Sequence, residues 1–104
     1  MMKMQRAALA AIAALLVSSA PVTADEVADK LCAILTELVG DASLSGDDAK
    51  TAFNVKLGDA FADTPQTLGM LVRKADEIAE STCPDARSAA LAKLGVAYLS
   101  SAMY

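Results

Sequence analysis

Residues 25–39 read DEVADKLCAILTELV and carry the clearest structural signal in the chain. Their apolar side chains recur at the three- and four-residue spacing of an amphipathic helix, which places them on one face. We expect the buried face of this helix to consist of Val27, Leu31, Ile34, Leu35 and Leu38. Gly40 follows the run and is expected to end the helix, because glycine favours helix ends over helix interiors.

Two further helices are predicted after this one. Ser45 predicts the start of the second helix, because Asp48 follows three positions later as in a capping box. Thr64 and Pro65 predict the start of the third helix, with threonine as the N-cap and proline at the first helical position. The expected apolar stripes are Ala49, Phe53, Leu57, Ala60 and Phe61 in the second helix, and Leu68, Leu71, Val72, Ala75, Ile78 and Ala79 in the third.

Pro84 predicts the start of a fourth helix, because proline disfavours a helical residue before it and suits the first turn after it. The residues of this helix expected to face inward are Ala90, Leu94, Ala97 and Met103. The chain has no strand-like alternation of useful length. The sequence therefore predicts an all-α fold, a small bundle of about four short helices.

The first 24 residues are predicted to be a cleavable secretory signal peptide. Lys3 and Arg6 form a short positive region, and the stretch from Ala7 to Val17 is wholly apolar. Val22-Thr23-Ala24 then places small side chains where signal peptidase requires them. We therefore expect the protein to be exported. The periplasm is the preferred location and the extracellular medium the alternative.

The alternative interpretation of the apolar run is a retained membrane anchor. A helix of this run would span about 16 Å, against a hydrocarbon core of about 30 Å, and Pro21 weakens any extension of it. We therefore expect residues 25–104 to form a single mature helical domain without an integral membrane anchor.

Cys32 and Cys83 are the only cysteines of the chain. In a small exported domain an intramolecular disulfide is the expected state, with two free thiols or an intermolecular bridge as alternatives. The two residues do not form a Cys-x-x-Cys pair, which argues against a redox-active couple. The bundle is therefore predicted to contain one intramolecular disulfide.

The net charge of the mature domain limits the classes of molecule that it is expected to bind. Removal of Lys3 and Arg6 reduces the nine basic side chains to seven, against thirteen acidic ones, for a formal net charge of −6. Recognition of nucleic acid and anionic lipid depends on lysine and arginine, so neither is expected as a primary partner.

Enzymatic chemistry is not expected. The chain contains no histidine, the commonest general base and metal ligand, and neither a Gly-x-Ser-x-Gly nor a Ser-x-x-Lys motif is present. The loop that begins at Asp41 matches the first half of a calcium-binding loop, but Ala52 stands where the bidentate glutamate is required. Asp76 and Glu80 are four positions apart and are expected on a solvated helix face. No catalytic residue, metal ligand or cofactor is therefore predicted.

The end of the chain is unusually apolar, and its candidate partner-contact residues are Tyr98, Leu99, Met103 and Tyr104. Tyrosine is enriched at protein interfaces. Two alternatives stay open from the sequence: this end docks on its own bundle, or it forms a contact surface for another protein.

These observations favour a small exported protein that acts by binding another protein, such as an inhibitor or immunity-type protein. In layout the chain also resembles the periplasmic acid-stress chaperones of the HdeA type, which are short, exported, all-α proteins with one disulfide. Their second cysteine precedes a final helix, as Cys83 does here. The resemblance implies a stress chaperone as the alternative function. It rests on no sequence motif, and the residues after Cys32 are apolar where that family has polar and aromatic ones. A metal carrier or an enzyme is the residual alternative.

Overall fold

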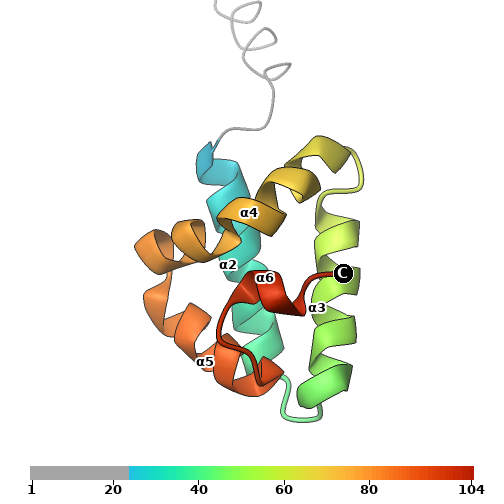
Figure 1. Ribbon diagram of the computed structural model, residues 1–104, viewed down its shortest axis with the longest axis vertical. Helices are drawn as coiled ribbons and strands as arrows, with labels where there is room; N and C mark the ends of the chain where they lie inside the picture. The colour runs from blue at the N-terminus through green and yellow to red at the C-terminus, as the bar shows by residue number, and fades with distance from the viewer. Residues whose placement is uncertain (1–23) are drawn as a thin grey trace, which may run out of the picture.

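The computed structural model describes residues 24–104, and every regular element in this part of the chain is a helix, without strands. The predicted signal peptide, apart from Ala24, lies outside the described residues. The elements are α2 (Ala24–Gly40), α3 (Gly46–Ala60), α4 (Pro65–Thr82), α5 (Pro84–Leu94) and the single-turn α6 (Leu99–Ala102), shown in Figure 1. The all-α prediction is confirmed. In residues 24–104, no helix combines the length and the apolar character that a bilayer span requires.

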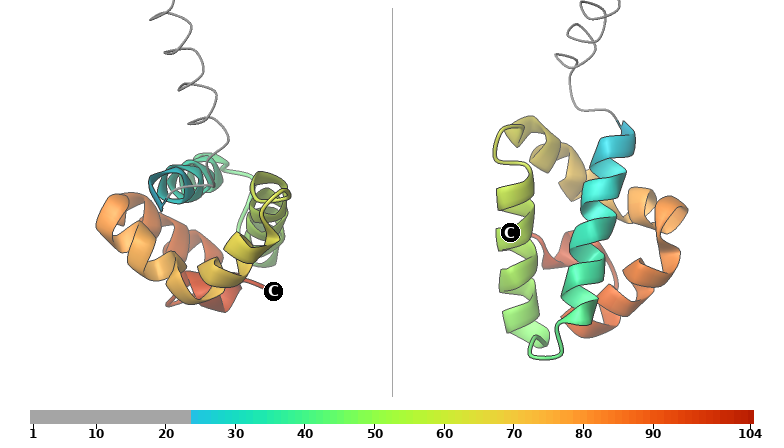
Figure 2. Two further views of the ribbon diagram at one scale, coloured as in Figure 1. Left: turned by 90° about the horizontal axis from the view of Figure 1, so that it is seen from above. Right: turned by 180° about the vertical axis from the view of Figure 1, so that it is seen from behind.

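The helices are arranged in two layers around a shared core. The first layer is α2 and α3, which run antiparallel and lie side by side in the view from behind (Figure 2). The second layer is α4 and α5, which cross the front of that pair in Figure 1 and both pack against α2. The short helix α6 contacts α3, α4 and α5, and the chain then ends beside α3 (Figure 1).

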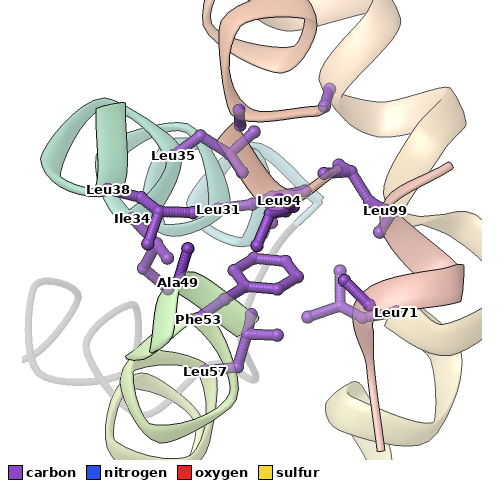
Figure 3. Packing of buried hydrophobic residues seen from close by; sticks show 14 of the residues in the cluster. Leu31, Ile34, Leu35, Leu38, Ala49, Phe53, Leu57, Leu71, Leu94 and Leu99 are labelled. Atoms are coloured by element: carbon purple, nitrogen blue, oxygen red, sulfur yellow. The ribbon is translucent and has the colours of Figure 1, made fainter. Parts of the chain in front are cut away.

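The core is formed by the apolar faces that the periodicity predicted. All five residues expected on the buried face of α2 are buried, and Phe53 of α3 projects among leucines from α2, α4 and α5 (Figure 3). The largest fully buried side chains are Phe53, Phe61, Leu31, Leu35, Leu38, Leu71, Leu94 and Leu99. Complete burial of a leucine or phenylalanine contributes about 1.5–3 kcal/mol, so these side chains are the main source of stability.

The helix starts lie where the sequence predicted them, but the caps differ. Ser45 and Thr64 occupy the N-cap positions of α3 and α4, and neither side chain makes a capping hydrogen bond. Pro65 and Pro84 begin α4 and α5 as expected. The N–H of the first helical residue has no hydrogen-bond acceptor within the helix, so the missing N–H of proline costs nothing there.

The predicted fourth helix is shorter than expected and the prediction for its second half is wrong. Gly95 adopts a left-handed conformation with φ +70°, which ends α5 at Leu94. The N–H groups of Gly95 and Val96 both donate to the carbonyl of Leu91, a common helix-ending pattern. The chain then turns back and forms α6, so Ala97 is exposed instead of buried.

The predicted disulfide is confirmed. Cys32 and Cys83 are bonded, with their Cα atoms 6.1 Å apart and 51 positions separating them in sequence. Cys32 lies on the flank of α2, and Cys83 lies at the joint between α4 and α5. The bridge therefore ties the first layer to the second.

Candidate functional site

An apolar groove of about 280 Å³ lies between α3, α4 and the end of the chain. It is lined by Asn54, Leu57 and Gly58 of α3, by Leu68, Leu71 and Val72 of α4, and by Met103 and Tyr104. Most of these side chains are apolar, and the amide of Asn54 is the main polar group among them. A concave apolar surface with few polar groups is the usual form of a binding site.

Asn54 holds the end of the chain against the groove. Its side-chain amide donates at 2.8 Å to the carbonyl of Ala102, and its Oδ1 accepts at 3.0 Å from the N–H of Tyr104. The same amide also donates to the carbonyl of Lys50 on its own helix. Both polar atoms of Asn54 are therefore used, and the backbone of the last residues is fixed beside α3.

The four candidate contact residues divide into two groups. Leu99 is fully buried in the core, so its prediction as a contact residue is corrected: its side chain packs against its own bundle. Met103 is partly buried and lines the groove together with Tyr104, whose side chain is 86% exposed. Tyr98 is 59% exposed and precedes α6. The end of the chain therefore docks on its own bundle and leaves two tyrosines facing outward.

Val72 is a surface residue of the groove that sequence reasoning placed in the core. Its side chain is 46% exposed. The periodicity of α4 could not reveal this, because Val72 lies next to Leu71 at the edge of the apolar stripe, and within residues 24–104 that edge stays exposed. Val55 of α3 is similarly exposed, at 56%, but does not line the groove.

Asp76 anchors the start of α6. Its Oδ1 accepts from the backbone N–H of Leu99 at 2.7 Å and from Nη2 of Arg87 at 2.9 Å, and its Oδ2 accepts from the N–H of Ser100 at 3.3 Å. The expectation of a solvated carboxylate is wrong here, because the Asp76 side chain is only 22% exposed. Its partners lie too far away in sequence for local spacing to reveal them.

The electrostatics of Asp76 follow from these contacts. Partial burial opposes the charged carboxylate, but the Leu99 N–H, the Arg87 guanidinium and the Ser100 N–H together outweigh it and lower the pKa of Asp76. The carboxylate is therefore charged at neutral pH and acts as the N-terminal cap that α6 otherwise lacks.

The loop that begins at Asp41 is organised by the protein itself. The Asp41 carboxylate accepts from the N–H and the hydroxyl of Ser43, which lowers the pKa of Asp41. The ammonium of Lys93 donates to the carbonyls of Asp41 and Leu44 and pins the loop to α5. Across residues 24–104, no three acidic or cysteine side chains are grouped in a way that could hold a metal ion.

A second, more open cleft lies between α2 and α3 and is lined partly by charged residues. Its Lys56 and Glu37 form an ion pair at 3.1 Å, and Lys30 donates to the carbonyl of Ala60 while lying over the Phe61 ring. Lys30, Glu37 and Lys56 are thus engaged in contacts within the protein, so the apolar groove beside α4 is the stronger candidate site.

No protein-family model matches the chain, and neither a curated protein nor a solved structure matches it.

Proposed function

We propose that this is an exported protein that acts by binding another protein through the groove between α3 and α4. The observation that carries the proposal is the pairing of an apolar groove with an exposed valine and an exposed tyrosine, Val72 and Tyr104, at its surface. Contiguous apolar surface marks interaction sites, and aromatic residues are enriched at interfaces relative to the rest of the surface.

The preformed character of the groove favours a binder with a fixed surface, such as an inhibitor or immunity-type protein. Leu57 and Leu71 form part of the groove and are also core residues, and Asn54 fixes the wall contributed by the end of the chain. A rigid wall loses little conformational freedom when a partner binds, which leaves more of the contact energy for affinity.

Two features support export: the predicted signal peptide and the disulfide. The predicted signal peptide directs secretion, and the bond between Cys32 and Cys83 is compatible with an oxidising compartment. With seven basic and thirteen acidic side chains after removal of Lys3 and Arg6, the mature domain is suited to a protein partner instead of nucleic acid. A Gram-negative periplasm is the proposed compartment.

Site-specific photo-crosslinking in the producing cell tests this proposal. A photoreactive amino acid is placed at Val72, within the groove, and in a matched variant at Val55, a comparably exposed valine outside it. The proposal predicts one predominant protein adduct from position 72 that is absent from position 55. Identical adduct patterns from the two positions, or no protein adduct from position 72, would refute it.

A further inference from the structure

The last nine residues, 96–104, form a segment that we call the C-terminal strap. It comprises α6 and the residues on either side of it, and it lies across α3, α4 and α5 (Figure 1). Two polar side chains anchor its backbone. Asp76 binds the start of α6, and Asn54 binds the residues that follow α6.

The two anchors differ in chemistry. Asn54 is a neutral amide whose hydrogen bonds do not depend on pH. Asp76 binds through a carboxylate, and all its contacts with the strap and with Arg87 require it to accept hydrogen bonds. Protonation of Asp76 weakens these contacts and leaves the Arg87 guanidinium without its counterion.

The strap has little intrinsic stability. Its helix is a single turn, and an isolated turn is unstable in water because nucleation fixes several residues for each hydrogen bond formed. Leu99 and Ala102 are its buried apolar side chains. The folding of the strap therefore depends on its hydrogen bonds to Asp76 and Asn54, whereas α2–α5 are stabilised mainly by the packing of longer helices.

Helices α2–α5 are stabilised by interactions that do not involve the strap. The disulfide joins α2 to the joint between α4 and α5, and the strap lies beyond the covalent loop that it closes. The buried leucines of α2 lie on the side of the core away from Leu99, and Phe53 of α3 packs between them and Leu71 (Figure 3).

We infer that the C-terminal strap opens as a unit when the Asp76 carboxylate is neutralised, while α2–α5 stay folded. Opening removes Met103 and Tyr104 from the groove wall and uncovers the side of Leu71 that faces Leu99 (Figure 3). The strap thus controls the width of the groove. The opening itself is independent of the proposed function, and only its effect on partner binding rests on that function.

Arg87 of α5 is the charged side chain that faces Asp76, and it is 15% exposed. From the strap, Asp76 accepts from the N–H groups of Leu99 and Ser100, and the titratable side chains of the strap, Tyr98 and Tyr104, are both exposed. On α4 itself, Lys74 and Glu77 pair with each other. In the described part of the chain, α2 and α3 contribute no ion pair to Asp76. The trigger is therefore the Asp76 carboxylate and its Arg87 partner.

Amide hydrogen exchange of the oxidised mature protein, resolved by residue, tests the inference. The decisive probe is the N–H of Tyr104, because it bonds to Asn54 and does not contact Asp76. Asp76→Asn is compared with wild type and with Asp63→Asn, which removes an exposed carboxylate from the loop before α4. In Asp76→Asn we expect the protection of Tyr104 to fall at least about tenfold, since hydrogen bonds to charged groups are among the stronger ones. In Asp76→Asn, Leu35 in α2 should remain far better protected than Tyr104, because the core amides exchange only when the whole bundle unfolds. Asp63→Asn should retain wild-type protection at both positions.

Wild-type protein examined at falling pH provides a second measurement without a substitution. As the pH is lowered through about 3.9, the ordinary pKa of aspartate, the protection factor of Tyr104 should decrease before that of Leu35 does.

If only the Leu99 and Ser100 amides lose protection in Asp76→Asn, the strap does not open as a unit and the inference is wrong. It is equally wrong if the protection of Leu35 falls to the same level as that of Tyr104, or if Asp76→Asn fails to fold, because Asp76 would then support the whole bundle. Partner crosslinking from position 72 is a separate readout, so its failure leaves the exchange result intact.

Discussion

The backbone N–H of Leu99 donates a 2.7 Å hydrogen bond to the carboxylate of Asp76, 23 positions earlier in the chain. The cap of α6 is thus supplied by another helix, α4. This arrangement fixes the direction in which the chain returns after Gly95 and places Met103 and Tyr104 at the groove.

We expect Asp76→Asn to lower the free energy of unfolding at pH 7 by roughly 1.5–3 kcal/mol, the range for hydrogen bonds to a charged group. The pKa of Asp76 is lowered in the folded protein, so its contribution is complete above the unfolded pKa and is lost as pH falls through the folded value. Urea titrations between pH 7 and pH 2 should therefore show the difference between wild type and variant shrinking below about pH 3.9. A difference that stays constant down to pH 2 would contradict the assignment.

Loss of the disulfide should cost about 2–5 kcal/mol, the usual range for a small secreted domain. Cys83→Ser and Cys32→Ser are expected to have equal effects, because each breaks the same bridge. Denaturant titration of both variants, alongside oxidised and reduced wild type, measures this. Two titratable thiols in freshly exported native protein would show that the bridge is not the native state.

Substitutions at two nearby positions of α3 should have very different effects on the free energy of unfolding. Phe53→Ala should destabilise the protein by about 3–5 kcal/mol, because it removes a fully buried ring. Val55→Ala, two residues away and 56% exposed, should change stability by less than about 0.5 kcal/mol. Thermal or urea unfolding of the two variants provides the comparison, and similar losses at both positions would contradict the packing.

Apolar periodicity predicted most of this fold because four helices each bury a regular stripe. The stripe of α2 was predicted without error, and Pro65 and Pro84 marked two helix starts. Cys32 and Cys83 indicated their own pairing because the chain has no other cysteines.

The candidate site was only partly predictable. Gly95 was not recognised as a helix end, so the turn that creates the strap was missed. Asp76 and Arg87 lie on different helices, and neither spacing nor composition indicates that Asp76 caps α6. The exposure of Val72 depends on which edge of α4 its neighbours leave uncovered, and that is a property of the assembled bundle.

Cleavage of the predicted signal peptide should give the exported protein a defined N-terminus. The exported protein should begin at or near Asp25, since Val22-Thr23-Ala24 forms the expected cleavage site. Intact mass of the protein recovered from the periplasmic fraction checks this. A species in the membrane fraction that retains Lys3 and Arg6 would show that the apolar segment is an anchor.

The most direct test of binding through the groove is the affinity of the crosslinked partner for two matched variants, measured by isothermal titration calorimetry at pH 7. Val72→Asp places a charge within the groove, and Val55→Asp places the same charge on a comparably exposed site outside it. We expect Val72→Asp to weaken binding at least about tenfold, equivalent to about 1.4 kcal/mol. Val55→Asp should stay within about twofold of wild type, as expected for a surface change outside the interface. Equal affinities of the two variants would contradict binding through the groove.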